Sequence, residues 1–157
     1  MSKIKLRNLL NHDLIISVPE MRLRREMRPN QAITIDSEKL DEAMSYNGVA
    51  NLFRYGYVRI ETDAEDIDTD VFEDLGIDLE KNKKLYSMNE LKELMEKGTD
   101  VELEEVLKDT SEERKQIVLA AALATDGLTF AKMNMISEYT GENIIALRKR
   151  KQDLTGK

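Results

Sequence analysis

The chain has 157 residues, of which 41% are hydrophobic, 35% are charged and 5% are aromatic, and it contains neither cysteine nor tryptophan. The lack of cysteine excludes disulfides, thiolate metal sites and a thiol nucleophile. The apolar fraction can support a core in one domain or in two small ones, which argues against wholesale disorder. No stretch has the length of a secretory signal or a membrane span, which predicts a cytosolic protein unless it leaves as part of a larger particle.

The net charge of −7 is unevenly distributed along the chain. Residues 1–60 carry 10 basic and 7 acidic side chains, a net of +3. Residues 61–110 carry 6 and 18, a net of −12, and residues 111–157 carry 8 and 6, a net of +2. An acidic middle argues against a general nucleic-acid coat and is compatible with copies of the chain packing through complementary patches.

The first sixty residues alternate apolar and charged side chains in short runs that turn residues separate. This period of two predicts half-buried strands. We expect a β-rich module over residues 1–61, barrel-like or sandwich-like, with a helical insertion. The predicted strands cover about 4–9, 14–18, 21–27, 32–35 and 57–60, and the predicted helices cover 37–46 and 48–55.

The third predicted strand is rich in arginine and lies between the two prolines of the chain, Pro19 and Pro29. Because the total charge is acidic, this basic segment is predicted to contact protein rather than nucleic acid. Its side chains at 21, 23 and 25 share one face, so the arginine at 25 is expected to have a covered stem and to pair with a glutamate at 20 or 26. The candidate protein-contact residues are Arg22, Arg24, Arg25 and Arg28.

Residues 62–86 form a strongly acidic segment, predicted to be a linker or short helix whose apolar side chains dock on a neighbour. Asp66, Asp68 and Asp70 have the spacing of a calcium loop. However, Val71 and Ile77 stand where that loop needs glycine and a bidentate glutamate. The sequence therefore predicts no calcium site here.

Residues 87–157 are predicted to form a bundle of about five short helices, so the fold class is α+β. Three capping boxes mark helix starts, at Ser87 with Glu90, Thr99 with Glu102, and Thr110 with Glu113. The third box opens a predicted helix over 111–126 that is rich in alanine. Apolar residues on most of its sides predict a central helix that its neighbours approach closely.

The C-terminus predicts a helix over 128–139, a turn at Tyr139-Thr140-Gly141, and a helix over 143–154. This is the outline of a helix-turn-helix with a basic second helix. The alternative is bundle packing, because the first half of the last helix is apolar and basic side chains near a helix end complement its dipole. The candidate nucleic-acid contacts are Arg148, Lys149, Arg150 and Lys151.

No motif for catalysis is present. The serines lack the context of a nucleophile elbow, no glycine-rich phosphate loop occurs, and the single histidine, His12, lies in a predicted exposed turn. The sequence therefore predicts a protein that is not an enzyme, with no catalytic residues, cofactor or metal.

The runs IKLRNL, LIISVPEM and RLRREMRPNQAITI, together with the helical C-terminal segment, resemble a family of small tailed-bacteriophage proteins associated with the virion, particularly the capsid. The resemblance implies a structural component, either a decoration or accessory subunit or a head-junction protein. Its partners would be major capsid or head-tail junction proteins and copies of itself, in the virion and, during assembly, in the host cytoplasm. Two other hypotheses are a DNA-binding regulator that uses the last helix and a small protein that inhibits a host factor.

Overall fold

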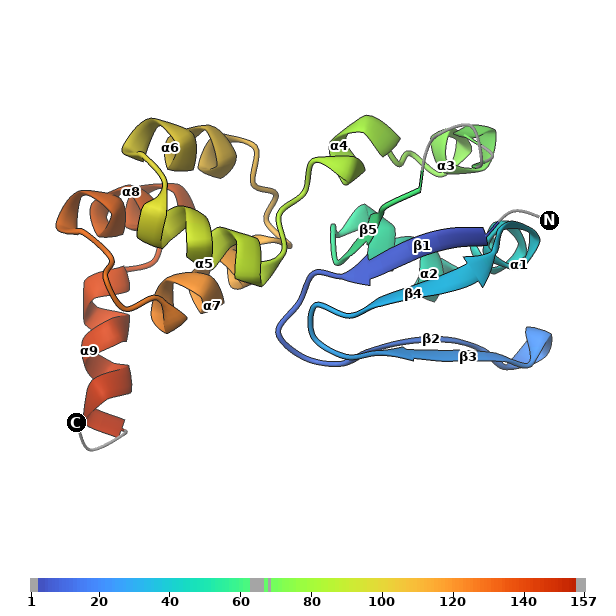
Figure 1. Ribbon diagram of the computed structural model, residues 1–157, viewed down its shortest axis with the longest axis horizontal. Helices are drawn as coiled ribbons and strands as arrows, with labels where there is room; N and C mark the ends of the chain where they lie inside the picture. Colours follow the sequence, from blue (N-terminus) through green and yellow to red (C-terminus); the bar gives the residue numbers. More distant parts are fainter. Residues whose placement is uncertain (1–2, 63–66, 68, 155–157) are drawn as a thin grey trace. The chain divides into compact units, whose positions relative to one another are not determined.

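The computed structural model describes residues 3–62, 67 and 69–154 (Figure 1). The predicted α+β class is confirmed, with two small sheets in the first half and helices in the second. Internal contacts divide the chain into two units, Met1–Ser87 and Met88–Lys157. Within the parts of the chain that the structure covers, no helix is both long enough and apolar enough to cross a membrane.

The main sheet of the first unit is antiparallel with the strand order β4-β1-β5. Strand β1 spans Lys3–Asn8, β4 spans Ala32–Asp36 and β5 spans Val58–Ile60. The alternation predicted for β1 is confirmed, since Ile4 and Leu6 are fully buried and Lys3 and Lys5 are exposed. The strand therefore buries one face in the core and exposes the other.

Strands β2 (Leu14–Val18) and β3 (Leu23–Met27) form a separate antiparallel hairpin, inserted in the chain between β1 and β4. The two sheets do not join into a closed barrel. The third strand begins two residues later than predicted, because Pro19–Met21 form a short 3-10 helix, η1, that fills the hairpin turn. Proline fixes the φ angle that such a helical turn requires, which explains the later start.

Asn8 joins the hairpin to the main sheet and is fully buried. Its amide nitrogen donates hydrogen bonds to three carbonyls, those of His12 at 2.8 Å, Met27 at 3.0 Å and Arg28 at 3.1 Å. Its side-chain oxygen accepts from the Leu10 N–H at 2.9 Å. One amide thus satisfies backbone groups on both chain segments at the base of the hairpin, just before β2 and at the end of β3.

Helices α1 (Ser37–Ala43) and α2 (Asn47–Arg54) follow β4 and close the core of the first unit. Their buried residues include Leu40, Ala43, Val49 and Phe53. The hairpin contributes to the buried set through alternate side chains on both of its strands. The buried residues of the hairpin are Leu14, Ile16, Val18, Leu23 and Met27.

The acidic segment belongs to the first unit. It contains helices α3 (Thr69–Asp74) and α4 (Leu79–Lys83). Phe72 of α3 is fully buried and packs edge-to-face on Phe53, with ring centroids 5.7 Å apart. Asp66 and Asp68 of the calcium-like spacing lie outside the described residues.

Helix α4 covers the free edge of β5 through Asn82. The Asn82 side-chain oxygen accepts from the Ile60 N–H at 2.8 Å, and its nitrogen donates to the Val58 carbonyl at 2.9 Å. This buried amide therefore occupies the hydrogen-bonding groups that another strand would otherwise use.

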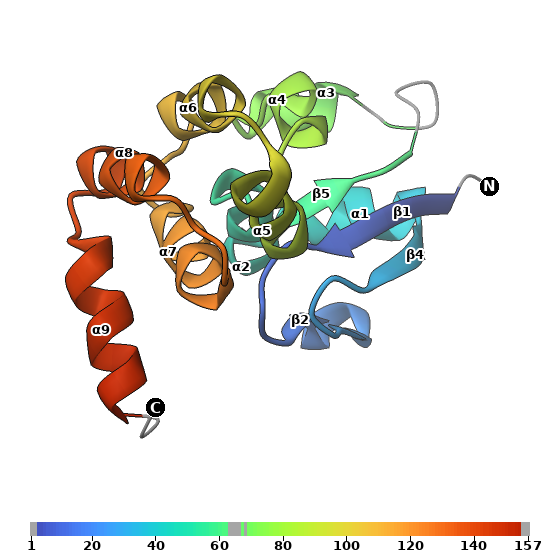
Figure 2. The ribbon, with the colours of Figure 1, turned by 60° about the vertical axis from the view of Figure 1, so that its left-hand side comes forward.

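The second unit consists of short helices, α5 (Met88–Lys97), α6 (Asp100–Lys108), α7 (Lys115–Ala124), α8 (Phe130–Thr140) and α9 (Ile144–Leu154). The expected central role of the alanine-rich helix is confirmed. Figure 2 shows α7 beside α5, α8 and α9, each of which it contacts. Ala121 and Ala122 are fully buried, and their small side chains allow this close approach.

The capping predictions for the second unit have mixed outcomes. The Thr99 hydroxyl accepts from the Glu102 N–H at 3.1 Å, so the cap of α6 is confirmed. The predicted box at Thr110 is wrong, because its hydroxyl donates back to the Val106 carbonyl at 3.0 Å. Helix α7 starts later than predicted, at Lys115, after a turn.

Lys132 links α8 to the end of α5. It is 5% exposed, and its ammonium group donates to the carbonyls of Met95 at 3.0 Å and Gly98 at 2.6 Å. The last carbonyls of a helix lack partners within the helix and carry partial negative charge. A lysine on a neighbouring helix therefore serves as the C-terminal cap of α5.

Candidate functional site

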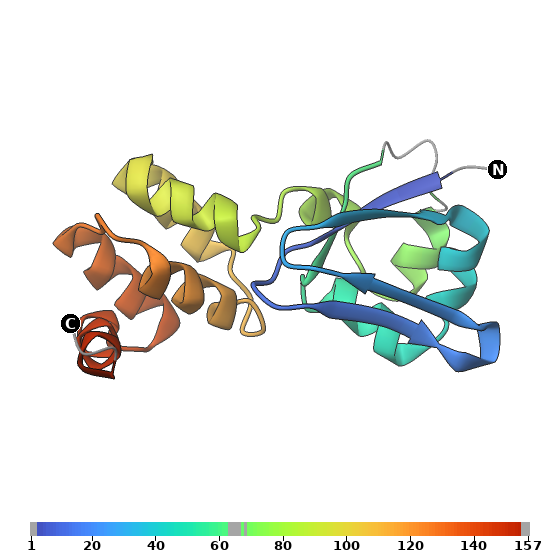
Figure 3. The same ribbon diagram turned by 60° about the horizontal axis from the view of Figure 1, so that its bottom comes forward.

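The outward face of the β2–β3 hairpin is the candidate docking surface, and Figure 3 shows the hairpin coming forward. In the ladder, Ile15 lies opposite Glu26 and Ser17 lies opposite Arg24. All four side chains are exposed. The outward face of the hairpin is defined below as these four residues, Ile15, Ser17, Arg24 and Glu26.

Arg22 lies at the tip of the hairpin with φ of 52° and ψ of 35°. Its N–H donates to the Pro19 carbonyl at 3.0 Å and closes the turn, and its side chain is exposed. The left-handed conformation favours glycine or asparagine and costs an arginine about 1 kcal/mol. Sequence pattern gave no indication of this conformation.

Arg24 pairs with Glu26 at 2.6 Å on the outward face, and the two side chains are 63% and 64% exposed. Such an exposed pair contributes little to stability, about 0–1 kcal/mol. Both charges therefore remain accessible to a partner.

The expected pairing of Arg25 is wrong. Its guanidinium donates to the Thr34 carbonyl of β4 at 2.8 Å, and neither Glu20 nor Glu26 is its partner in that contact. Arg25 lies on the same side of β3 as the buried Leu23 and Met27, which directs it back toward the sheet. Its half-covered stem agrees with the expectation.

Arg28 lies at the opposite end of β3 from Arg22. Its side chain is exposed, and its N–H donates to the Gln31 side chain at 2.7 Å in the turn before β4. The structure thus places the four candidate arginines at two turns and on two faces of one strand. Only Arg24 belongs to the outward face of the hairpin.

Ile15 is a candidate contact residue that the sequence interpretation did not single out. It is 44% exposed at the middle of β2. The period-two pattern of LIISV contained the signal, because burial of Leu14, Ile16 and Val18 places Ile15 and Ser17 outside.

A second charged group gathers around Glu61 on the outer side of the main sheet. Glu61 Oε2 accepts from Arg7 Nε at 2.8 Å and from Arg59 at 2.6 Å, and the Glu61 side chain is 18% exposed. Arg59 also donates to the Leu85 carbonyl at 2.8 Å, and Arg7 donates to the Asn30 carbonyl at 2.6 Å. Arg59 and Glu61 are two residues apart, but Arg7 is 54 residues from Glu61, so local patterns could not predict that the three side chains meet.

Burial alone would raise the pKa of Glu61. The hydrogen bonds and positive charges of Arg7 and Arg59 outweigh burial, so the pKa lies below the ordinary value of 4.5. The ionised carboxylate therefore stabilises the fold above that ordinary value, and its contribution is lost as the pH falls through the lower, folded-state pKa.

Glu61→Gln should lower the free energy of unfolding by about 2 kcal/mol near neutral pH, because two guanidinium groups lose a charged acceptor. Urea denaturation of both proteins near neutral pH and well below pH 4.5 measures the difference. We expect the difference to shrink in acid, where the wild-type carboxyl is protonated. An equal difference at both pH values would contradict the assigned ion-pair role.

The basic helix at the C-terminus uses two of its four candidate cations internally. Arg148 donates to the carbonyls of Ala122 and Thr125, each at 2.6 Å, and Lys151 donates to that of Leu123 at 3.0 Å. These carbonyls lie at the end of α7, where cations complement the helix dipole. Lys149 and Arg150 are exposed.

The turn between α8 and α9 is built as the sequence predicts. Gly141 has φ of 77° and ends α8, and the Ser137 hydroxyl accepts from the Ile144 N–H at 3.0 Å. Ile144 is fully buried and Ile145 is 38% exposed. The apolar start of α9 therefore serves packing at Ile144, as the bundle alternative requires.

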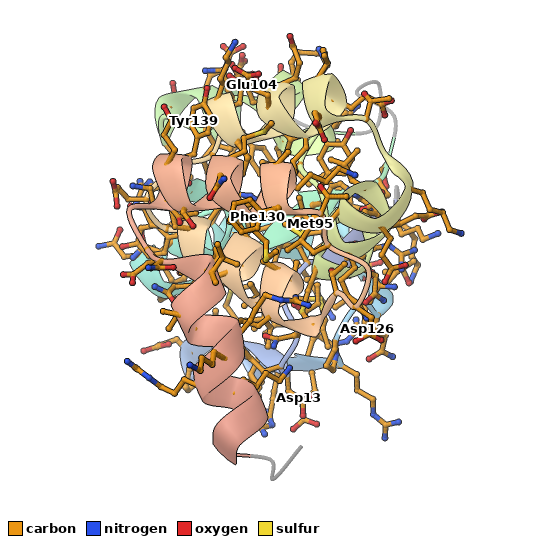
Figure 4. The ribbon with its side chains drawn as sticks, turned by 90° about the vertical axis from the view of Figure 1, so that its left-hand side faces the viewer. Asp13, Met95, Glu104, Asp126, Phe130 and Tyr139 are labelled. Carbon is orange, nitrogen blue, oxygen red and sulfur yellow. The ribbon has the colours of Figure 1, made fainter. Side chains whose placement is uncertain are left out.

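Helices α6 and α8 are joined by a polar contact that Figure 4 shows from the side of the second unit. The Tyr139 hydroxyl donates to Glu104 at 3.3 Å, and Lys108 lies 3.6 Å from Glu104. Desolvation and the nearby Glu104 carboxylate raise the pKa of Tyr139. This contact holds two helices together and involves none of the candidate site residues.

No family model, no curated protein and no solved structure matches this chain. The assignment of function therefore depends on the surfaces described above and on the resemblance of the sequence.

Proposed function

We propose that the protein is a non-enzymatic structural component of a tailed-phage virion, acting through protein–protein contacts. It would be a capsid-associated decoration or accessory subunit, or a head-junction protein. The resemblance of the strand segments and of the C-terminal helices to virion proteins supports this proposal. The hairpin with its arginines would face the shell or a neighbouring copy.

The conformation of Arg22 is the observation that carries the proposal. An arginine occupies a left-handed position where glycine would be less strained, and its exposed side chain projects from the tip of the hairpin. Backbone strain of this kind is typical of residues that are retained for function. Arginine is also among the residues enriched in protein interfaces.

Replacing both Arg22 and Arg24 by glutamate should abolish incorporation into particles, because each change reverses a charge that faces the partner. Mass spectrometry of particles assembled with the variant, compared with wild type, measures the copy number. Circular dichroism of the purified variant checks that the fold is retained. Normal incorporation of a folded variant would place the contact elsewhere.

Arg22→Gly provides the matched control for the turn itself. Relief of the left-handed strain should raise the free energy of unfolding by up to about 1 kcal/mol, whereas loss of the arginine should lower incorporation. A variant that is more stable yet poorly incorporated separates the two roles. Unchanged incorporation would mean that Arg22 is not a contact residue.

Mass spectrometry of native particles also separates the proposal from the two other hypotheses. Absence from particles, together with DNA binding that is lost when Lys149, Arg150 and Lys151 become alanine, would favour the regulator. Absence from particles with one stoichiometric host partner would favour an inhibitor.

A further inference from the structure

We propose that the outward face of the hairpin is self-complementary and pairs with the same face of a second copy of this chain. The inference rests on the proposed function, which requires neighbouring copies, and it identifies the partner of the hairpin. The surface is the set already defined, Ile15, Ser17, Arg24 and Glu26.

The first argument is the balance of charge on this face. Arg24 and Glu26 carry opposite charges and are exposed to nearly the same extent, 63% and 64%. They stand two residues apart on one strand, so they point to the same side. A partner that is wholly acidic or wholly basic would repel one of the two, whereas an identical face offers one charge of each sign.

The second argument is geometric and follows from the register of the ladder. Consider a second hairpin facing the first and related to it by a two-fold axis that runs across the strands. This operation exchanges the two ends of each strand. It therefore places Arg24 over Glu26 of the second copy, and Glu26 over its Arg24. The Arg24–Glu26 pair within each copy can then be replaced by two ion pairs between copies, each joining Arg24 of one copy to Glu26 of the other.

The third argument concerns the apolar residue on the same face. The same axis places Ile15 over Ser17 of the second copy, and it does so twice. Ile15, which is 44% exposed in the single chain, then loses contact with water against a small side chain. The contact has an apolar part on β2 and a charged part on β3.

Four side chains from each copy make a contact much smaller than a standard interface of about 800 Å² per partner. Pairing in dilute solution should therefore be weak. Because exposed ion pairs contribute to it, it should also weaken as salt is added. Such a contact becomes effective when copies are held close together on a common surface, where the effective concentration is high.

A charge-swap series on the full chain tests the inference, with sedimentation equilibrium over a wide range of protein concentration as the measurement. Wild type should self-associate. Arg24→Glu places glutamate over glutamate, and Glu26→Arg places arginine over arginine, so each should weaken association about tenfold or more. The double variant R24E/E26R restores opposite charges between copies and should restore association.

Two exposed residues on α5 supply matched controls, Lys97→Glu for the loss of positive charge and Glu93→Arg for the gain. Both should leave association unchanged, and circular dichroism should show every variant folded. A wild type that stays monomeric at all concentrations would overturn the inference. So would single variants that associate normally, or a double variant that does not recover.

Failure of this inference is distinguishable from failure of the proposed function. Presence in purified particles without a charge-swap effect in solution overturns the pairing of copies and leaves the virion proposal standing. Absence from particles, with association that the double variant restores, overturns the virion proposal and leaves the self-complementary face.

Discussion

Asn8→Leu should lower the free energy of unfolding by about 3 kcal/mol or more, because it leaves buried backbone groups without partners. Asn8 is fully buried and bonds three carbonyls and one N–H at the base of the hairpin. Leucine has a similar volume, so the change tests the hydrogen bonds rather than the packing.

Urea denaturation measures this loss, and hydrogen exchange locates it. The amides of β2 and β3 should exchange faster in the variant than those of β1 and β4, because the hairpin is tied to the sheet through Asn8. Asn11→Leu is the control, since Asn11 is an exposed asparagine in the same turn region. A loss below about 1 kcal/mol would show that water replaces these bonds.

Lys132→Met should lower the free energy of unfolding by about 2–3 kcal/mol. Methionine keeps an unbranched stem in the buried site but cannot donate to the carbonyls of Met95 and Gly98. The end of α5 then loses its cap, and two carbonyls near the core lose a charged donor.

Thermal or urea denaturation of the full chain measures this effect, with Lys97→Met as the control. Lys97 also lies in the last turn of α5, but it is exposed. Its loss should cost less than about 1 kcal/mol through the helix dipole alone. Equal effects of the two substitutions would contradict a specific capping role for Lys132.

Local periodicity was sufficient to predict the five strands and helices α1 and α2 of the first unit, although it missed the short helix η1. The alternation of Ile4 and Leu6 with lysines, and the bounds of β2, follow from side-chain direction along a strand. The conformation of Arg22 could not be predicted, because arginine has no preference for the left-handed region.

Contacts between residues distant in sequence account for the rest. Glu61 meets Arg7 only because β1 and β5 are neighbours in the sheet. Arg148 and Lys151 were predicted as nucleic-acid candidates from their charge, yet their bonds to the end of α7 depend on how α9 packs against α7. At Thr110 the capping motif was present, but the hydroxyl bonds the preceding helix instead.

Side chains from elsewhere in the first unit form hydrogen bonds with the outer edges of β4 and β5 in the main sheet. Asn82 bonds the outer side of β5, and Arg25 bonds the Thr34 carbonyl of β4. The Lys5 N–H donates to the Thr62 hydroxyl and the Lys5 carbonyl accepts from the Glu61 N–H, so both groups point away from β4. Thr34 lies opposite Lys5 in the antiparallel ladder, so its N–H and carbonyl point away from β1.

Unpaired strand edges template cross-β growth when a protein is crowded. The buried Asn82 amide blocks such growth at the outer edge of β5. At the outer edge of β4, the Arg25 guanidinium bonds the Thr34 carbonyl at the protein surface. If the chain polymerises during overproduction, we therefore expect the outer edge of β4 to pair with another strand more readily than the outer edge of β5, which Asn82 covers.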